Sequence, residues 1–180
     1  MSVQIALLRA VNVGGTGKLP MADLRALATK IGLRGVRTLL QSGNLIFDAG
    51  TKTPGVIEKL LEGACVKKFS LETEVYVRTA AEIDEIIARN PFAKEAKVNP
   101  GHLVVLFMHT SPAAKAFTAL QAAIRGRERI RAFGRHAYIV YPDGIGRSKL
   151  TSGLLARHLG TPGTARNWNT LLKLAAATAE

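Results

Sequence analysis

Cysteine is nearly absent from this chain, since Cys65 is the only one among 180 residues. A single cysteine excludes an internal disulfide and fits the reducing environment of the cytoplasm. Long apolar runs are absent as well, because the longest, Leu103 to Met108, is far too short to span a bilayer. The N-terminus also lacks the basic and apolar segments of a signal peptide. We therefore expect a soluble cytoplasmic protein without membrane contacts.

Acidic residues are scarce relative to basic ones. The chain has 25 Lys+Arg and 13 Asp+Glu, which gives a net charge of +12. Residues 1–90 carry 12 basic and 9 acidic side chains, whereas residues 91–180 carry 13 basic and 4 acidic ones. Such a one-sided field attracts anionic partners and speeds their encounter with the protein. Positive charge can equally serve solubility alone, so a specific anionic partner and no partner both stay open.

Groups suited to catalysis or metal binding are also few. Cys65 falls in step with Ile57 and Leu61 on the apolar face of a predicted helix, which indicates a core residue. His102 and His109 bracket one predicted strand at an odd spacing, so they point to opposite faces and cannot share a metal. Motifs such as H-x-x-x-H, C-x-x-C and G-x-S-x-G do not occur. The sequence predicts no metal, no cofactor and no identifiable catalytic residue, although an enzyme is not excluded.

Hydrophobic residues make up 47% of the chain, and their periodicity predicts an α+β protein built as two related halves. The first half has the order β-α-β-β-α-β. Its predicted elements are residues 3–8, a helix over 20–31, strands over 36–41 and 45–48, a helix over 54–69 and a strand over 74–78. The second and third strands are joined by Ser42-Gly43-Asn44, a sequence typical of a hairpin turn.

The same order is predicted again after residue 101. The elements are residues 102–108, 112–124, 127–133, 137–141, 148–159 and 164–166. Two further helices lie outside this repeat, a connector over 79–89 and a C-terminal helix over 167–177. The split β-α-β pattern is typical of ferredoxin-like folds. We predict two ferredoxin-like subdomains, residues 1–100 with the connector helix and residues 101–180 with the C-terminal helix.

A glycine-rich loop, residues 12–18, follows the first predicted strand. It matches a P-loop only in Gly17-Lys18, because Asn12 stands where the first glycine belongs and Leu19 where Ser or Thr belongs. Nucleotide hydrolysis of the P-loop kind is therefore not supported. A lysine ahead of a helix N-terminus still favours anions, because free N–H groups and the helix dipole point there. A plain strand-to-helix turn is the alternative.

A second candidate anion site lies in residues 141–149. Pro142-Asp143-Gly144 favours a turn, and Ser148 is placed to cap the helix that follows. Arg147 and Lys149 then fall at a helix N-terminus, where cations oppose the dipole. A bound anion would reverse that unfavourable interaction. A solvated loop is the alternative.

The third candidate surrounds the only tryptophan, Trp168. Arg166, Asn167 and Asn169 flank it, and one interpretation is that they line a polar pocket. Asn167 is also a natural helix cap, and a lone tryptophan beside a cap is typical of a core anchor for a terminal helix. Both interpretations stay open.

Three arginines, Arg127, Arg129 and Arg131, alternate along one predicted strand and would share one face. The neighbouring strand carries Tyr138. Arginines with aromatic residues on an open sheet are how RNA-recognition modules hold single strands. The match to such modules is partial, because the first strand has no partner aromatic in Leu103-Val104-Val105. A solvated basic face is the alternative.

Five separated motifs occur in order along the chain. They are Leu7-Leu8-Arg9-Ala10-Val11-Asn12-Val13-Gly14-Gly15, Leu19-Pro20-Met21-Ala22-Asp23-Leu24-Arg25, Gln41-Ser42-Gly43-Asn44, residues 141–150, and Thr164-Ala165-Arg166-Asn167-Trp168-Asn169-Thr170. Over essentially its whole length the chain resembles the bacterial family called domain of unknown function 1697. The resemblance implies a pair of ferredoxin-like subdomains, in agreement with the predicted repeat. It implies no activity, substrate or cofactor.

Three hypotheses for function follow, and the first is a cytoplasmic protein that binds a small anionic, phosphate-bearing ligand. Its predicted ligand-binding residues are Arg9, Asn12, Gly14, Gly15, Lys18, Gln41, Ser42, Asn44, Arg147, Ser148, Lys149, Arg166, Asn167 and Asn169. The second is nucleic-acid binding through Arg127, Arg129, Arg131 and Tyr138. The third is an enzyme acting on a phosphorylated or nucleotide substrate, in which Lys18, Arg147 or Lys149 stabilises charge.

Overall fold

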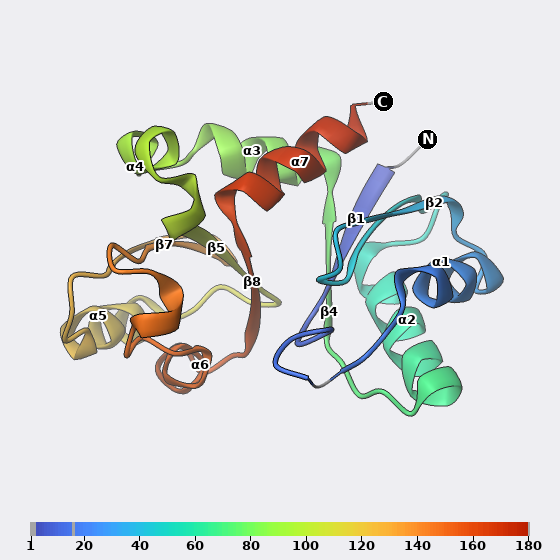
Figure 1. Ribbon diagram of the computed structural model, residues 1–180, viewed down its shortest axis with the longest axis horizontal. Coiled ribbons are helices and arrows are strands. Elements are labelled where there is room, and N and C mark those ends of the chain that lie inside the picture. The colour runs from blue at the N-terminus through green and yellow to red at the C-terminus, as the bar shows by residue number, and fades with distance from the viewer. Residues whose placement is uncertain (1–2, 16, 180) are drawn as a thin grey trace. The chain divides into compact units, whose positions relative to one another are not determined.

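The computed structural model describes residues 3–15 and 17–179, and the chain divides into two compact units (Figure 1). Unit 1 comprises Met1–Glu85 together with Lys173–Glu180, and unit 2 comprises Ile86–Leu172. Among the described residues, each unit contains one four-stranded antiparallel sheet. The predicted subdomains, residues 1–100 with the connector helix and residues 101–180 with the C-terminal helix, stay a prediction.

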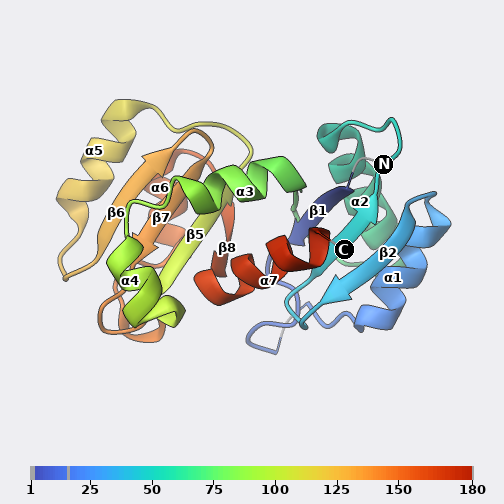
Figure 2. The same cartoon turned by 90° about the horizontal axis from the view of Figure 1, so that it is seen from above.

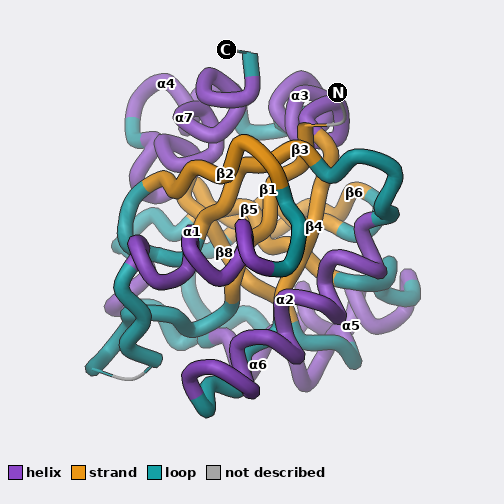
Figure 3. The backbone as a smooth tube through the Cα atoms, turned by 90° about the vertical axis from the view of Figure 1, so that its right-hand side faces the viewer, coloured by secondary structure: helices purple, strands orange, loops and turns teal. Residues whose placement is uncertain are grey.

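Unit 1 has two helices packed on one face of its sheet. Its elements in chain order are β1 (Val3–Leu8), α1 (Met21–Lys30), β2 (Arg34–Leu39), β3 (Asn44–Asp48), α2 (Pro54–Phe69), β4 (Val75–Thr79) and the start of α3 (Ala80–Ala88). The strand order is β2-β3-β1-β4, and every pair of neighbours is antiparallel. Figure 3 shows α1 and α2 in front of these strands.

The core of unit 1 lies between the sheet and these two helices. Alternation along the strands turns Ala6 and Leu8 of β1 to the same face as Val75 and Val77 of β4. Cys65 of α2 belongs to the same buried cluster. Burial, with a smaller contribution from Glu62, raises the pKa of its thiol to about 11. The prediction that this cysteine is a core residue is confirmed.

Unit 2 repeats the arrangement with additional short elements. In chain order it contains α4 (Ala93–Val98), the 3-10 helix η1 (Pro100–His102), β5 (Leu103–Met108), α5 (Ala114–Ala123), β6 (Arg129–Phe133), β7 (His136–Val140), the 3-10 helix η2 (Ile145–Arg147), α6 (Ser152–Leu159), β8 (Gly163–Asn167) and the start of α7 (Trp168–Thr178), whose remaining residues from Lys173 onward belong to unit 1. Figure 2 shows β6, β7, β5 and β8 side by side in that order. In Figure 1 these strands lie between α4 above and α5 and α6 below.

The two sheets have equivalent topology and register. The order β6-β7-β5-β8 in unit 2 matches β2-β3-β1-β4 in unit 1, strand for strand. The third residue of the first strand pairs with an arginine in both, as Ile5 with Arg78 and as Val105 with Arg166. This is the strand order of a split β-α-β fold occurring twice. The predicted α+β class and the duplicated ferredoxin-like layout are confirmed.

A helix follows the fourth strand in each unit. Thr79 ends β4 and caps α3 through a capping box, because its hydroxyl accepts from the Glu82 amide at 3.1 Å and its amide donates to the Glu82 carboxylate at 2.9 Å. Asn167 ends β8 and caps α7, accepting from the Thr170 amide at 2.9 Å. The two predicted additional helices therefore occupy equivalent positions, and the repeat extends to β-α-β-β-α-β-α.

The edge strand of unit 1, β4, is protected by two glutamates of α2. The Val75 amide donates to Glu62 at 2.9 Å, and the Val77 amide donates to Glu58 at 2.8 Å. Glu58 and Glu62 are one helical turn apart, which matches the two-residue spacing of outward-facing amides on the strand. These carboxylates satisfy donors that an open edge would present to another chain.

Predicted and observed elements differ mainly in the second half. The predicted helix over 148–159 begins only at Ser152, and the predicted strand over 127–133 begins at Arg129. The helix predicted to open at Pro112 begins at Ala114. The short helix α4 was not predicted, because its sequence Ala-Lys-Glu-Ala-Lys-Val has no apolar stripe and none of its residues is buried.

Candidate functional site

Asn12 forms hydrogen bonds with the end of the loop between β1 and α1 and with the neighbouring turn. The Asn12 side-chain amide donates to the carbonyls of Leu19 and Gln41, each at 2.8 Å, and its side-chain oxygen accepts from the Leu19 amide at 2.8 Å. Its backbone amide donates to Gly17 at 3.0 Å. Gly17 is required there, since its φ is +60° and an added Cβ would lie 2.4 Å from the Ala10 carbonyl. Thr16 lies outside the described residues.

The turn between β2 and β3 lies against this loop. Besides the contact of Asn12 with Gln41, the Leu8 amide donates to the Gly43 carbonyl at 2.9 Å. Asn44 is fully buried and donates to the Leu39 carbonyl at 2.8 Å and to the Ser42 hydroxyl at 3.0 Å. The structure therefore brings two predicted ligand-binding segments together. Within them, Asn12 and Asn44 position the backbone, whereas Gln41 is exposed.

The start of α1 is open. The helix begins at Met21, with Pro20 as its N-cap residue and no side chain that caps it. Lys18 is exposed two residues before this cap. Gly14 and Gly15 are also exposed, and nothing lies within 4 Å of the position of a Cβ on either. Exposed backbone, an uncapped helix start and a lysine are thus neighbours in the chain.

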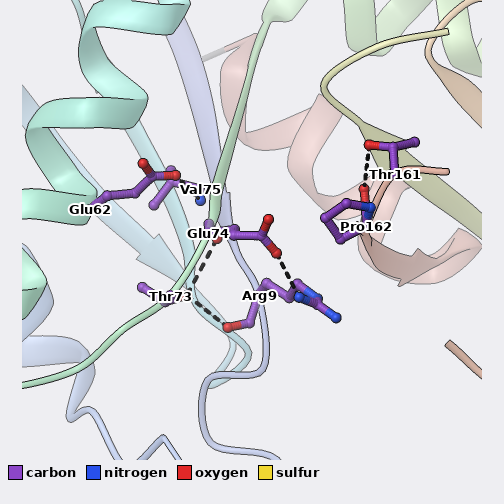
Figure 4. Close-up of polar contacts among 7 residues, drawn as sticks. All are labelled: Arg9, Glu62, Thr73, Glu74, Val75, Thr161 and Pro162. Atoms are coloured by element: carbon purple, nitrogen blue, oxygen red, sulfur yellow. Dashed lines mark hydrogen bonds and ion pairs between the residues drawn. The ribbon is translucent and has the colours of Figure 1, made fainter. Parts of the chain in front are cut away.

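Arg9 contacts Thr73 and Glu74, which immediately precede β4. Its guanidinium forms an ion pair with Glu74, and its Nη1 donates to that carboxylate at 2.6 Å (Figure 4). The Thr73 hydroxyl donates to the Arg9 carbonyl at 2.7 Å. Both side chains of the ion pair are more than one-third exposed, which allows water to screen the attraction. A ligand at Arg9 would compete with Glu74.

The predicted anion site at residues 141–149 has a different local structure from the one expected. The N-cap of α6 is Thr151, whose hydroxyl accepts from the Leu154 amide at 3.2 Å. Ser148 instead donates to Glu128 and accepts from the Leu150 amide at 2.9 Å. Arg147 and Lys149 precede the cap rather than occupying the first turn. They therefore do not occupy the positions at which we expected them to oppose the α6 dipole.

A cavity of about 50 Å³ lies beside Lys149 and is also lined by Glu128 and Leu150. Ligand pockets for small molecules usually exceed about 300 Å³. This cavity accommodates water rather than a phosphate-bearing ligand. Binding at Arg147, Ser148 or Lys149 stays a prediction that this cavity does not support.

Arg166 lies within β8 and is 7% exposed. Its Nη1 donates to the Thr164 hydroxyl at 2.8 Å and to the Ala165 carbonyl at 2.9 Å. Burial lowers the pKa of its guanidinium to about 10. Trp168 is 5% exposed, as a core anchor would be, whereas Asn169 is exposed. Ligand binding by Arg166, Asn167 and Asn169 stays a prediction.

The arginines predicted to form a nucleic-acid surface have partners within unit 2. Arg127 precedes β6 rather than lying in it, and its hydrogen bonds to Asp143 hold the pKa of that carboxyl below its usual range. Arg129 pairs with Glu95 of α4 and lies over the Phe92 ring, 5.2 Å from its centroid. These ion pairs are partly solvated, yet they occupy the guanidinium groups.

Tyr138 is not an exposed stacking surface. The ring is 1% exposed, and its hydroxyl donates to the Ile86 carbonyl at 2.7 Å. Residues 86–95 therefore cover this face of the sheet, where Arg89 also lies over the Phe133 ring. The expectation that Tyr138 is exposed on an open sheet face is wrong, because the end of α3, the start of α4 and the residues between them pack on this face. Nucleic-acid binding itself stays a prediction.

The described residues contain neither a cluster that could hold a metal ion nor a helix that could span a membrane. Within residues 3–15 and 17–179, no group of three or more His, Cys, Asp or Glu side chains could hold a metal ion. None of the helices in this part of the chain is long and apolar enough to cross a membrane.

A groove that the sequence did not predict lies between α1 and the last turns of α2. It has a volume of about 770 Å³ and is lined by Lys30, Ile31, Ala64, Lys67, Lys68 and Phe69, among others. We call it the α1–α2 groove. Its sequence signal is a set of apolar residues beside lysines at the ends of two helices. This signal predicts a groove only when it is known that the two helices pack side by side.

Comparisons with known proteins agree with the fold. Among solved structures, the chain is similar to SP0830, a conserved bacterial protein from Streptococcus pneumoniae, with a TM-score of 0.73 and 19% identity over 97% of each chain. That likeness concerns the fold alone. No curated protein matches the chain. Residues 1–138, which contain three of the five motifs, match the family described as Protein of unknown function (DUF1697), so the predicted family is confirmed and the chain belongs to it.

Proposed function

We propose that the protein binds a small anionic, phosphate-bearing ligand at the loop between β1 and α1. The observation that carries this proposal is the start of α1, where no side chain caps the helix. The amides of Met21 and Ala22 consequently lack a capping acceptor, and the helix dipole adds partial positive charge at the same place. An anion at a helix N-terminus satisfies both.

The loop in front of α1 suits a ligand because its own contacts hold it open. The three side-chain hydrogen bonds of Asn12 fix the loop without help from a ligand. Gly14 and Gly15 have φ values of +61° and +80°, which glycine adopts without strain. Both are exposed, and neither has a side chain that would shield its backbone. Preorganisation of this kind lowers the entropy that binding would otherwise cost.

Lys18 supplies the charge. Its side chain is exposed, and among the described residues it has no ion-pair partner. Asp23 is the one carboxylate in the first turn of α1, and it makes no capping bond there. An ammonium group beside uncapped amides gives a phosphate charge-assisted hydrogen bonds in addition to the neutral ones. Gln41, exposed in the adjoining turn, supplies a side-chain amide.

Titration of the full chain with inorganic pyrophosphate by isothermal calorimetry tests this proposal. We expect Lys18→Ala to weaken binding about tenfold, because one charge-assisted hydrogen bond contributes about 1.5 kcal/mol. Lys59→Ala is the matched control, since Lys59 is an exposed lysine of α2 that lies outside both this loop and the α1–α2 groove. Equal weakening by both variants would indicate net charge alone and would overturn the proposal.

Nucleic-acid binding is the alternative function, and the exposed Arg131 allows a test of it. Such binding would weaken steeply with salt, and Arg131→Ala would flatten the slope by about one counterion. Arg127 and Arg129, paired with Asp143 and Glu95, would contribute less. An enzyme acting on a phosphorylated or nucleotide substrate would share the Lys18 site, and no observation favours a particular reaction.

A further inference from the structure

The α1–α2 groove has an apolar floor. Ile31 follows the end of α1, and Ala64 and Phe69 belong to α2; all three are half-buried and pack against the core of unit 1. Leu27 of α1 lines the groove beside them and is 7% exposed. The groove exists because Ala26 and Ala64 present only methyl groups between the two helices. Larger side chains at these positions would fill it.

The rim of the groove is cationic. Lys30 in the last turn of α1 and Lys67 and Lys68 in the last turn of α2 line it, against the single carboxylate of Asp23. All three lysines are exposed, and within the described part of the chain none has an ion-pair partner. Each lysine also favours the dipole of its own helix, but that effect does not require them to meet at one groove.

Size and chemistry together identify the occupant. A volume of about 770 Å³ lies within the range of pockets for small molecules, which are mostly apolar with a few convergent polar groups. An apolar floor selects a hydrocarbon body, and a rim with three cations and one anion selects a negative head group. We infer that the α1–α2 groove binds a single-chain anionic amphiphile, its chain on Ile31 and Phe69 and its carboxylate or phosphate among the lysines.

This site is separate from the one proposed for the small anion. The loop of residues 12–18 precedes the first turn of α1, whereas the groove lies along the helix from Asp23 to Ile31. The two proposals therefore fail independently. Lys18→Ala should leave amphiphile binding unchanged, and a block in the groove should leave pyrophosphate binding unchanged.

Three probes with the same ten-carbon chain test the inference: decanoate, decanol and decyltrimethylammonium, each below its micelle concentration. We expect decanoate to bind the full chain about tenfold more tightly than decanol, and the cationic probe to bind least. In NMR spectra, decanoate should shift the signals of Ile31, Ala64 and Phe69. Equal affinity for all three probes, or shifts confined to other residues, would overturn the inference.

Two kinds of variant make the test specific. Ala26→Trp should fill the groove and abolish decanoate binding, whereas Thr29→Trp, on an exposed position of the same helix outside the groove, should not. The double variant Lys67→Ala/Lys68→Ala, which leaves the core untouched, should weaken decanoate about tenfold and leave decanol unchanged. Binding of an acidic amphipathic helical peptide in place of decanoate would also refute the amphiphile and assign the groove to a protein partner.

Discussion

Arg78 and Arg166 occupy the same position in the two repeats: each is the fourth residue of an edge strand, and each is buried. In each, Nη1 donates to the carbonyl of the preceding residue, at 2.8 Å to Val77 and at 2.9 Å to Ala165. The repetition of one buried guanidinium at equivalent sites indicates a structural role in the fold. Arg166 was predicted from sequence as a ligand-binding residue. It shares this structural role with Arg78, which no motif identified.

Replacement of either buried arginine should destabilise the protein. We expect Arg78→Ala and Arg166→Ala each to lower the free energy of unfolding by about 2–4 kcal/mol, because each leaves a cavity and removes the donor of a backbone carbonyl. Urea denaturation followed by circular dichroism measures this loss. Arg131→Ala is the control, since Arg131 is exposed. Unfolding energies unchanged from the wild type would show that the buried guanidinium groups contribute nothing to stability.

Glu62→Ala should expose the edge of β4. The Val75 amide would lose its acceptor, at a cost of about 1–2 kcal/mol, and its hydrogen exchange should accelerate. Glu62→Gln keeps a side-chain oxygen that can accept and should restore most of the protection. Native-state hydrogen exchange at Val75 separates the two variants. Equal exchange rates in wild type and Glu62→Ala would mean that the carboxylate does not protect the edge.

Asn12→Asp tests whether the loop before α1 is preorganised. A carboxylate still accepts from the Leu19 amide but loses the two donations to Leu19 and Gln41. We expect stability to fall by about 2 kcal/mol and pyrophosphate affinity to fall as well, although residue 12 need not touch the ligand. Calorimetry and urea denaturation on the same sample measure both. Unchanged affinity with reduced stability would separate the loop from the site.

Cys65 gives the stability of the protein a pH dependence. Burial raises the pKa of the folded thiol from its ordinary value of 9.0 to about 11, so the unfolded thiol ionises first. The contribution of the buried neutral thiol is fully present below about pH 9 and is lost as pH rises through 11, at up to about 1.4 kcal/mol per pH unit. Cys65→Ala should remove this part of the decline in denaturation curves between pH 9 and 11. An identical decline in both proteins would assign it to other groups.

Sequence patterns were sufficient where apolar periodicity and strong end signals coincide. The strand over 3–8 and the helix over 54–69 have the predicted bounds, because a mostly apolar segment and a proline at the first helical position mark them. The duplication was likewise visible in the element order. The start of α6 could not be predicted, because Ser148 and Thr151 are both good caps and only the tertiary contact of Ser148 with Glu128 decides between them.

Long-range packing accounts for the site residues that sequence placed incorrectly. Tyr138 has the alternation of a strand residue on an open face, but residues 86–95 come from a distant part of the chain and cover it. Ligand binding by Asn12 and Asn44 stays a prediction, and the hydrogen-bond partners of both side chains were not foreseeable from spacing. The α1–α2 groove depends on the distance between two helices, which no local pattern encodes.

The most direct test of the central claim, anion binding at the start of α1, is an NMR titration of the full chain with inorganic pyrophosphate. We expect saturable shifts of the backbone amides of Gly14, Gly15, Lys18, Met21 and Ala22, lost in Lys18→Ala and retained in Lys59→Ala. Shifts scattered over the basic surface with none at Met21 and Ala22 would contradict the claim.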